Sequence, residues 1–152
     1  MPNKIDYAHM KAAEGYAELS YAKRLKVGAI ITKDDRVISI GYNGTPAGWD
    51  NDCEYEDIGF SDAVFGELQT LINRGLKTKP EVLHAEANAI GKLARSSESG
   101  INATMYLTHS PCFDCAKLIH VAGINKVFYR TQYRNTDGIE FLNKCNIEVE
   151  KI

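Results

Sequence analysis

The sequence predicts an α/β domain built around a mixed β-sheet. In the second half of the chain, short apolar segments alternate with segments of helical periodicity, an order typical of parallel strands joined by helices. Nearer the N-terminus, two apolar segments separated by Lys33-Asp34-Asp35 predict an antiparallel hairpin, which makes the sheet mixed. The 152 residues suit one domain, 1–152, since neither a repeat nor a linker-like stretch divides them.

The first half is expected to hold a helix, the hairpin and an irregular segment. A helix over residues 4–23 is predicted by apolar residues near helical spacing: Ile5, Ala8, Ala12, Leu19 and Ala22. The hairpin strands are residues 27–31 and 36–40. The irregular segment, 41 to about 80, opens with Gly-Tyr-Asn-Gly-Thr-Pro-Ala-Gly-Trp, whose residues permit unusual backbone angles. Within it, one helix is indicated by Ala63, Val64, Leu68, Leu71 and Ile72.

The second half is expected to alternate between helices and strands. A helix from Leu83 is indicated by Ala87, Ile90 and Ala94, and it ends in the polar stretch 96–100. The elements that follow are predicted as a strand at 104–108, a helix at 112–121, a strand at 126–129, a short helix at 139–143 and a strand at 147–150.

Composition and charge exclude several classes of protein. Hydrophobic residues at 44% and charged residues at 25% are typical of folded proteins and exclude disorder. A net charge of −2 argues against a nucleic-acid partner bound through a broad basic surface. There is neither an apolar run of about 20 residues that would cross a membrane nor a signal peptide. We therefore expect a cytoplasmic protein whose four cysteines are reduced.

Cys112 and Cys115 are the one local pair among these cysteines. Two cysteines three residues apart at a helix start lie on one face and can bind one zinc ion. The electropositive first helical turn also lowers a thiol's pKa. His84 offers a third ligand. A structural zinc site normally has a fourth protein ligand, whereas a catalytic one keeps a position for water, so these three residues predict catalytic Zn²⁺.

Glu86 is predicted to carry protons beside this metal. It lies roughly 200° around a regular helix from His84, so the two side chains cannot be neighbouring ligands on one helical face. His84 must therefore lie at the helix entrance if both are to approach one centre. Glu86 would take a proton from the zinc-bound water and deliver it to a leaving or ring nitrogen.

Each part of this pattern has a plainer interpretation. Cys-x-x-Cys alone is also found in redox pairs or by chance, and His-x-Glu alone means little. Together, each at a predicted helix start and with Pro111 before Cys112, they match the zinc-deaminase pattern H-x-E…P-C-x-x-C.

The sequence resembles the cytidine deaminase superfamily and, more narrowly, its dCMP deaminases. The resemblance runs in order over most of the chain. The zinc motifs are common to the superfamily, whereas the Gly-Tyr-Asn-Gly loop is more specific to dCMP deaminases. The stretches that carry it are Ser20–Arg24 with Val27–Ala29, Gly41–Pro46, His84–Ile90 and Ser110–Lys117. This resemblance implies a three-layer α/β/α fold with a five-stranded mixed sheet.

The resemblance also implies the reaction and its control. Ammonia would be removed hydrolytically from C4 of dCMP, giving dUMP for dTMP synthesis. Zinc hydroxide would attack C4 while Glu86 protonates N3 and then assists departure of the amine. The family further implies a homohexamer, activated by dCTP with Mg²⁺ and inhibited by dTTP.

Several residues are candidates for binding the substrate. Ser20, Arg24 and Lys26 lie at one helix-to-strand junction and could hold the phosphate, although a solvated helix end is the plainer interpretation. Asn43 would hold the deoxyribose hydroxyl; a plain Asn-Gly turn is disfavoured because Thr-Pro-Ala-Gly follows where a strand should return. The backbone of Ala85 would face the pyrimidine carbonyl. Tyr133 matches a family tyrosine near the phosphate, with a surface tyrosine as the alternative.

The nucleotide effector is expected against Tyr42, Asn43 and Gly44, where exposed backbone amides can receive phosphates. Trp49 and Asp50 are weaker candidates for this site.

One departure from the family concerns a second, structural zinc that some relatives carry. Ala22 replaces the first-helix cysteine of that site, and no histidine lies between His9 and His84. We predict that this second zinc is absent and that Cys53 is an ordinary thiol. Cys145, His9, His109 and His120 are expected to be structural or surface residues, with a position lining the pocket as the alternative for His109, which is close to the cysteines.

Three other functions stay open at this point. The enzyme could deaminate deoxycytidine or dCTP, it could act on a flipped base of tRNA, or the zinc could belong to a non-catalytic module.

Overall fold

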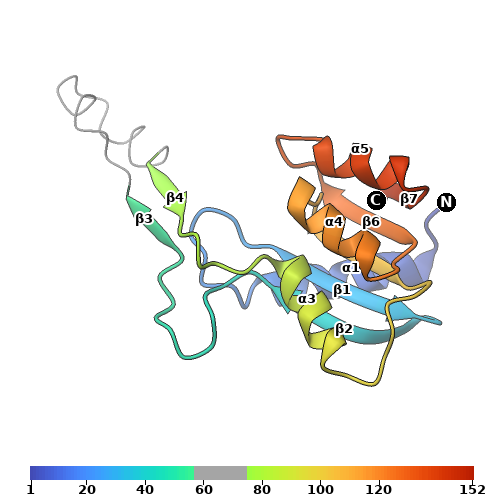
Figure 1. The fold of residues 1–152 in the computed structure, drawn as a ribbon, viewed down its shortest axis with the longest axis horizontal. Coiled ribbons are helices and arrows are strands. Elements are labelled where there is room, and N and C mark those ends of the chain that lie inside the picture. Colours follow the sequence, from blue (N-terminus) through green and yellow to red (C-terminus); the bar gives the residue numbers. More distant parts are fainter. Residues whose placement is uncertain (57–74) are drawn as a thin grey trace.

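The computed structural model describes residues 1–56 and 75–152 of the chain, and its centre is a five-stranded sheet (Figure 1). The order across the sheet is β2-β1-β5-β6-β7. These strands are β1 (Gly28–Lys33), β2 (Arg36–Tyr42), β5 (Thr104–His109), β6 (Lys126–Thr131) and β7 (Glu148–Lys151). The described helices are α1 (Lys4–Ala17), α3 (Ala85–Ala94), α4 (Phe113–Val121) and α5 (Asp137–Lys144). The helix expected within 63–72 lies outside the described residues.

The strand directions confirm the mixed sheet. Strand β1 is antiparallel to both β2 and β5, so the predicted N-terminal hairpin is present. Strands β5, β6 and β7 run parallel, with α4 and α5 as the connecting helices. The predicted strands and helices of the second half are all found, with bounds that differ by at most two residues.

Helices cover both faces of the sheet (Figure 1). Side chains on β5 alternate between the two layers, as the period of two in a strand requires. Met105 and Leu107 pack in the core beneath α3 and α4. Tyr106 points the other way and packs with Met10 and Phe128 beneath α1. The α/β fold with helices on both faces is therefore as predicted. No helix among the described residues is long and apolar enough to span a lipid bilayer.

Helix α1 differs from its prediction in length and in orientation. It ends at Ala17 instead of residue 23, after starting at an Asn3–Asp6 capping box. The expected apolar stripe is mostly exposed: Ile5 is 43% accessible and Leu19 53%. The buried face is instead formed by Asp6, Met10, Ala13 and Ala17. Alanines occur on both sides of this helix, and packing against the sheet decides between them.

A second, two-stranded sheet lies in the segment expected to be irregular. Strand β3 (Glu54–Glu56) pairs antiparallel with β4 (Leu76–Thr78). The pair extends away from the main sheet (Figure 1). The backbone amide of Lys79 donates to the carbonyl of Cys53, which prolongs the ladder. Strands of three residues show too little alternation to be recognised in the sequence.

Gly41 brings β2 against the first turns of α3. A Cβ at this position would overlap the carbonyl of Ala85 and the amide of Ala89. The Ser39 hydroxyl donates to the carbonyl of Ala89 at 2.6 Å on the same contact. This close approach fixes the position of the first turns of α3 against the sheet.

We expect Gly41→Ala to destabilise the fold by about 2–3 kcal/mol, because backbone must move to admit the methyl group. Urea denaturation measures this change. Gly91→Ala is the matched control, since a Cβ there meets nothing within 4 Å. In a helix interior, the control substitution should stabilise by about 0.5–1 kcal/mol. A Gly41→Ala protein as stable as the control would show that α3 does not need this close approach.

Candidate active site

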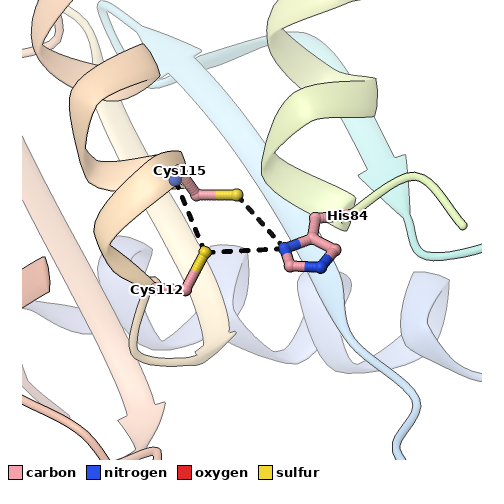
Figure 2. Close-up of side chains that lie close together, drawn as sticks. All are labelled: His84, Cys112 and Cys115. Carbon is pink, nitrogen blue, oxygen red and sulfur yellow. Dashed lines mark hydrogen bonds between the residues drawn. The ribbon is translucent and has the colours of Figure 1, made fainter. Parts of the chain in front are cut away.

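Three potential metal ligands meet at the starts of two helices. His84 is the N-cap residue of α3, with extended backbone angles, and Cys112 is the N-cap residue of α4. His84 Nδ1 lies 3.6 Å from Cys112 Sγ and 3.4 Å from Cys115 Sγ. Figure 2 shows the imidazole pointing at both sulfurs from the neighbouring helix. The predicted position of His84 at the helix entrance is thereby confirmed.

These distances fit a tetrahedral zinc ion. With Zn–S near 2.3 Å and Zn–N near 2.05 Å, a tetrahedron separates nitrogen from sulfur by about 3.6 Å. The two observed separations are 3.6 and 3.4 Å, and all the ligand atoms lie within 4.8 Å of one another. No other such group of three His, Cys, Asp or Glu residues occurs in the described parts of the chain. The donor set is therefore suited to Zn²⁺.

Protons are shared unevenly within this triad. Hydrogen bonds from Cys115 and His84 lower the pKa of Cys112 well below its ordinary value. The same interaction with Cys112, together with burial, raises the pKa of Cys115. The bond to Cys112 also raises the pKa of His84. Zinc requires thiolates and a neutral imidazole, so its binding displaces protons from Cys115 and His84.

Glu86 lies in the first turn of α3 and is 4% exposed. Burial raises the pKa of its carboxyl from the ordinary 4.5 to about 7, while His84 acts in the opposite direction. A carboxyl group that titrates near neutral pH can both accept and release a proton under physiological conditions. The position and pKa of Glu86 therefore suit the proton carrier predicted from the sequence.

A cleft opens beside the metal ligands and brings together most of the predicted site. Its wall includes five other predicted residues besides His84 and Cys112, namely Arg24, Asn43, Ala85, Glu86 and Tyr133. Arg24 and Tyr133 approach each other at the rim, where a guanidinium nitrogen of Arg24 lies 3.5 Å from the Tyr133 hydroxyl. Arg24 and Tyr133, which are 109 residues apart in sequence, thus meet at the cleft.

Two residues predicted for the phosphate do not line the cleft. Ser20 is buried, and its hydroxyl donates to the carbonyl of Asn43 at 2.8 Å while accepting from the amide of Ala22. Lys26 points toward Glu18, with 3.7 Å between the charged atoms. Ser20 therefore supports the Asn43 loop, and Lys26 belongs to an exposed ion pair.

Asn43 ties the Gly-rich loop to the start of β1. Its side-chain oxygen accepts from the amide of Val27 at 2.9 Å, and its side-chain nitrogen donates to the carbonyl of Leu25 at 2.8 Å. An asparagine amide carries two N–H donors, so one remains for a ligand in the cleft. Asn43 is both a structural clamp and a cleft residue.

The expectation of free phosphate-binding amides in this loop is wrong. The amide of Asn43 donates to the carbonyl of Val27, and the amide of Gly44 donates to the carbonyl of Leu83. The carbonyl of Tyr42 accepts from the side chain of Asn88. A nucleotide at Tyr42, Asn43 and Gly44 would need other contacts than these two amides.

His109 is a cleft residue that the sequence analysis assigned to structure or surface. Thr108 Oγ1 accepts from the amide of Gly28 at 3.0 Å and lies 3.0 Å from His109 Nδ1. Thr108 therefore holds the His109 ring through Nδ1 and leaves Nε2 without a described hydrogen bond. Burial lowers the pKa of His109, which favours the neutral ring. Its nearness to Cys112 in sequence was the one signal of this position.

Cys53 is 1% exposed and packs with Ala22 and Val82. Burial raises the pKa of its thiol. This environment suits the ordinary thiol expected from the sequence, although the absence of a second zinc stays a prediction.

Comparison with known proteins gives consistent matches. Residues 3–131 match the family model described as the cytidine and deoxycytidylate deaminase zinc-binding region. The deoxycytidylate deaminase of Enterobacteria phage T4 is 38% identical over 150 residues, covering 82% of this chain and 77% of the relative. That of Mycobacterium phage D29 is 41% identical over 117 residues, covering 77% of this chain and 87% of the relative.

A solved structure extends the match over the whole chain. The crystal structure of dCMP deaminase from the cyanophage S-TIM5, in complex with dCMP and dUMP, has 45% sequence identity and a TM-score of 0.85. The alignment covers 100% of this chain and 99% of that one.

Proposed function

The chain belongs to the cytidine and deoxycytidylate deaminase family, and from this premise we propose that it hydrolyses dCMP to dUMP and ammonia. The observation that carries the proposal is the zinc-type triad of His84, Cys112 and Cys115 beside buried Glu86, at a cleft whose rim holds Arg24. We further propose that residues 1–152 act as one domain. The similarity to a structure bound to dCMP and dUMP supports the choice of substrate.

In this mechanism the metal ion activates water and the carboxyl group of Glu86 carries the protons. When held by the triad, zinc supplies the Lewis acid that activates water for attack at C4. Glu86 would accept the proton of that water and donate it to N3 of the ring. It would then carry the proton of the new C4 hydroxyl to the amine, so that the C4–N bond breaks, ammonia leaves and the C4 carbonyl forms. Burial raises the pKa of the Glu86 carboxyl above its ordinary value, which suits a group that must both accept and release a proton.

The cleft walls provide contacts for the rest of the nucleotide. Arg24 and Tyr133 are the proposed phosphate contacts, because a guanidinium group and a hydroxyl are suitable donors to phosphate oxygens. The remaining N–H of Asn43 is assigned to the deoxyribose hydroxyl. The backbone of Ala85, at the first position of α3, is assigned to the pyrimidine carbonyl.

Control by nucleotides is proposed from the family resemblance of the Gly-Tyr-Asn-Gly loop. This control comprises activation by dCTP with Mg²⁺ and inhibition by dTTP. The family resemblance also supports the proposals that the chain assembles into a homohexamer and that its product dUMP is used for dTMP synthesis. The loop geometry assigns no phosphate to the amides of Asn43 and Gly44, since both are already bonded. Ammonia release measured over cytosine nucleotides, with and without dCTP and dTTP, tests substrate and effectors together.

Replacing Arg24 tests the phosphate assignment. We expect Arg24→Gln to raise KM for dCMP by about 10- to 100-fold, because a charge-assisted bond to the phosphate is lost. Turnover of deoxycytidine, which has no phosphate, should stay within about twofold of the parent value. Ammonia-release kinetics on both substrates measure this difference. An unchanged KM for dCMP would show that the phosphate binds elsewhere.

A further inference from the structure

Glu54 is a buried carboxylate whose hydrogen bonds go to the segment that carries Arg24. It begins β3 and is 5% exposed. Its Oε1 accepts from the backbone amide of Lys23 at 2.9 Å and from that of Arg24 at 3.0 Å. Its Oε2 is buried and has no hydrogen-bond partner among the described residues. The described bonds of this side chain therefore fix one short piece of backbone.

That piece of backbone lies between two residues that are anchored elsewhere, since the amide of Ala22 donates to Ser20 and the carbonyl of Leu25 accepts from Asn43. The described bonds of the Lys23 and Arg24 amides go to Glu54 alone. The piece lies between the end of α1 and the start of β1, in residues that form neither helix nor strand. The Arg24 side chain leaves it to line the cleft, and the hydrogen bond that this side chain makes among the described residues, to the Tyr133 hydroxyl, is long at 3.5 Å. Where the guanidinium group stands therefore depends mainly on where the backbone at 23–24 is held.

Two amides bonded to one carboxylate oxygen hold backbone more firmly than neutral acceptors do. Hydrogen bonds with an ionised partner are roughly twice as strong as neutral ones, and burial keeps water from competing for them. Glu54 also lies on the strand that pairs with β4, and Thr78 of β4 lines the same cleft. The carboxylate therefore connects the small sheet to the rim of the cleft.

We propose that Glu54 is a positioning residue for phosphate recognition, which acts by holding the Lys23 and Arg24 amides so that the guanidinium group faces the cleft. The proposal rests on the proposed function, in which Arg24 contacts the substrate phosphate. Glu54 itself touches no reacting atom. Its effect is expected in the binding of phosphorylated substrate and absent from the chemistry at the pyrimidine ring.

Substitution at Glu54 is measured on two substrates. We expect Glu54→Ala to raise KM for dCMP on the order of tenfold, with kcat and deoxycytidine turnover within about twofold of the parent. Glu54→Gln keeps an acceptor oxygen but loses the charge, so its KM should lie between those of Glu54→Ala and the parent. Asp52→Asn is the control, since this nearby carboxylate is exposed and bonds to Lys79 instead. Its kinetics should match those of the parent.

A double-mutant cycle shows whether Glu54 acts through Arg24. In an Arg24→Gln background, Glu54→Ala should add less than about twofold to the KM for dCMP, because the group that it positions is gone. Independent, multiplying effects would overturn the proposal. So would an equal loss on dCMP and deoxycytidine, which would indicate a general structural role.

Two further outcomes are informative. If Glu54→Ala does not fold, Glu54→Asp carries the same test, because its shorter side chain keeps the charge but cannot reach both amides without backbone movement. If Arg24→Gln leaves the KM for dCMP unchanged, both the phosphate assignment and the role of Glu54 fail. If Arg24→Gln does raise the KM for dCMP, but the effects of the Arg24 and Glu54 substitutions on this KM are independent, only the proposed role of Glu54 fails.

Discussion

Replacing Glu86 by glutamine is expected to lower kcat for dCMP by about 10³-fold or more while leaving a folded chain that still binds zinc. Glutamine has nearly the same shape but cannot accept or release a proton, so each proton transfer loses its carrier. General acid–base groups typically contribute 10²- to 10⁴-fold, and Glu86 is proposed to act in more than one step. Ammonia release and zinc content per chain, measured on the same preparation, check the result.

The control for this substitution is Asp114→Asn. Asp114 lies in the first turn of α4 between the two cysteines, but its side chain is 85% exposed and forms an ion pair with Lys117. Removing this charge should leave kcat within about twofold of the parent. A Glu86→Gln protein with substantial activity would exclude the carboxyl as the proton carrier. A loss of zinc in that variant would instead place Glu86 among the groups that hold the metal.

Stability provides a second check on the Glu86 variant. The pKa of Glu86 is raised from 4.5 to about 7 by burial, so the unfolded chain releases this proton first as the pH rises. Between these pH values the folded state of the parent loses stability, by at most about 3 kcal/mol. Glutamine removes this loss. At pH 8 and with metal removed, Glu86→Gln should therefore be at least as stable as the parent in urea denaturation.

Replacing Cys112 by alanine is the second large effect that we expect. The triad offers three protein ligands for a metal ion, and a site with two of them would bind zinc far more weakly. Zinc content should fall from about one ion per chain to near zero, and ammonia release from dCMP should fall by about 10³-fold or more. Metal analysis after dialysis and the ammonia assay measure the two losses.

Cys53→Ala is the matched control for the metal site and also tests the expected absence of a second zinc. Cys53 lies in a separate small cluster with Ala22 and Val82. The control protein should keep about one zinc per chain and the activity of the parent, with some loss of stability from its buried position. Two zinc ions in the parent, or one fewer in the control, would contradict this part of the account.

The chemistry of the site could be predicted from the sequence because its elements are local. His84 and Glu86 are two residues apart, and Cys112 and Cys115 are three apart, so helix geometry alone decides what each short motif can do. The helix starts were also local signals. That the two motifs meet at the starts of α3 and α4 needed the family pattern as well, since no spacing predicts a contact between residues so far apart.

The errors arose where packing between distant segments decides. In α1, Ala8 and Ala12 offer one apolar face and Ala13 and Ala17 another, and only contact with the sheet selects the second. The amides of Asn43 and Gly44 are taken by carbonyls of Val27 and Leu83, which no local pattern reveals.

Long-range contacts also explain the residues that the sequence did not point out. Glu54 accepts hydrogen bonds from amides about thirty positions earlier in the chain. His109 contacts a threonine whose hydroxyl is bonded to β1.

The ligand triad has a mechanical consequence for the fold. His84 precedes α3, Cys112 is the N-cap residue of α4 and Cys115 lies in its first turn. An ion held by all three would therefore close a loop of the chain that contains α3 and β5. Such a cross-link restricts the unfolded chain much as a disulfide does, and it does so without requiring an oxidising compartment. The zinc ion proposed to activate water would thus also be a reversible cross-link between α3 and α4 on one face of the sheet.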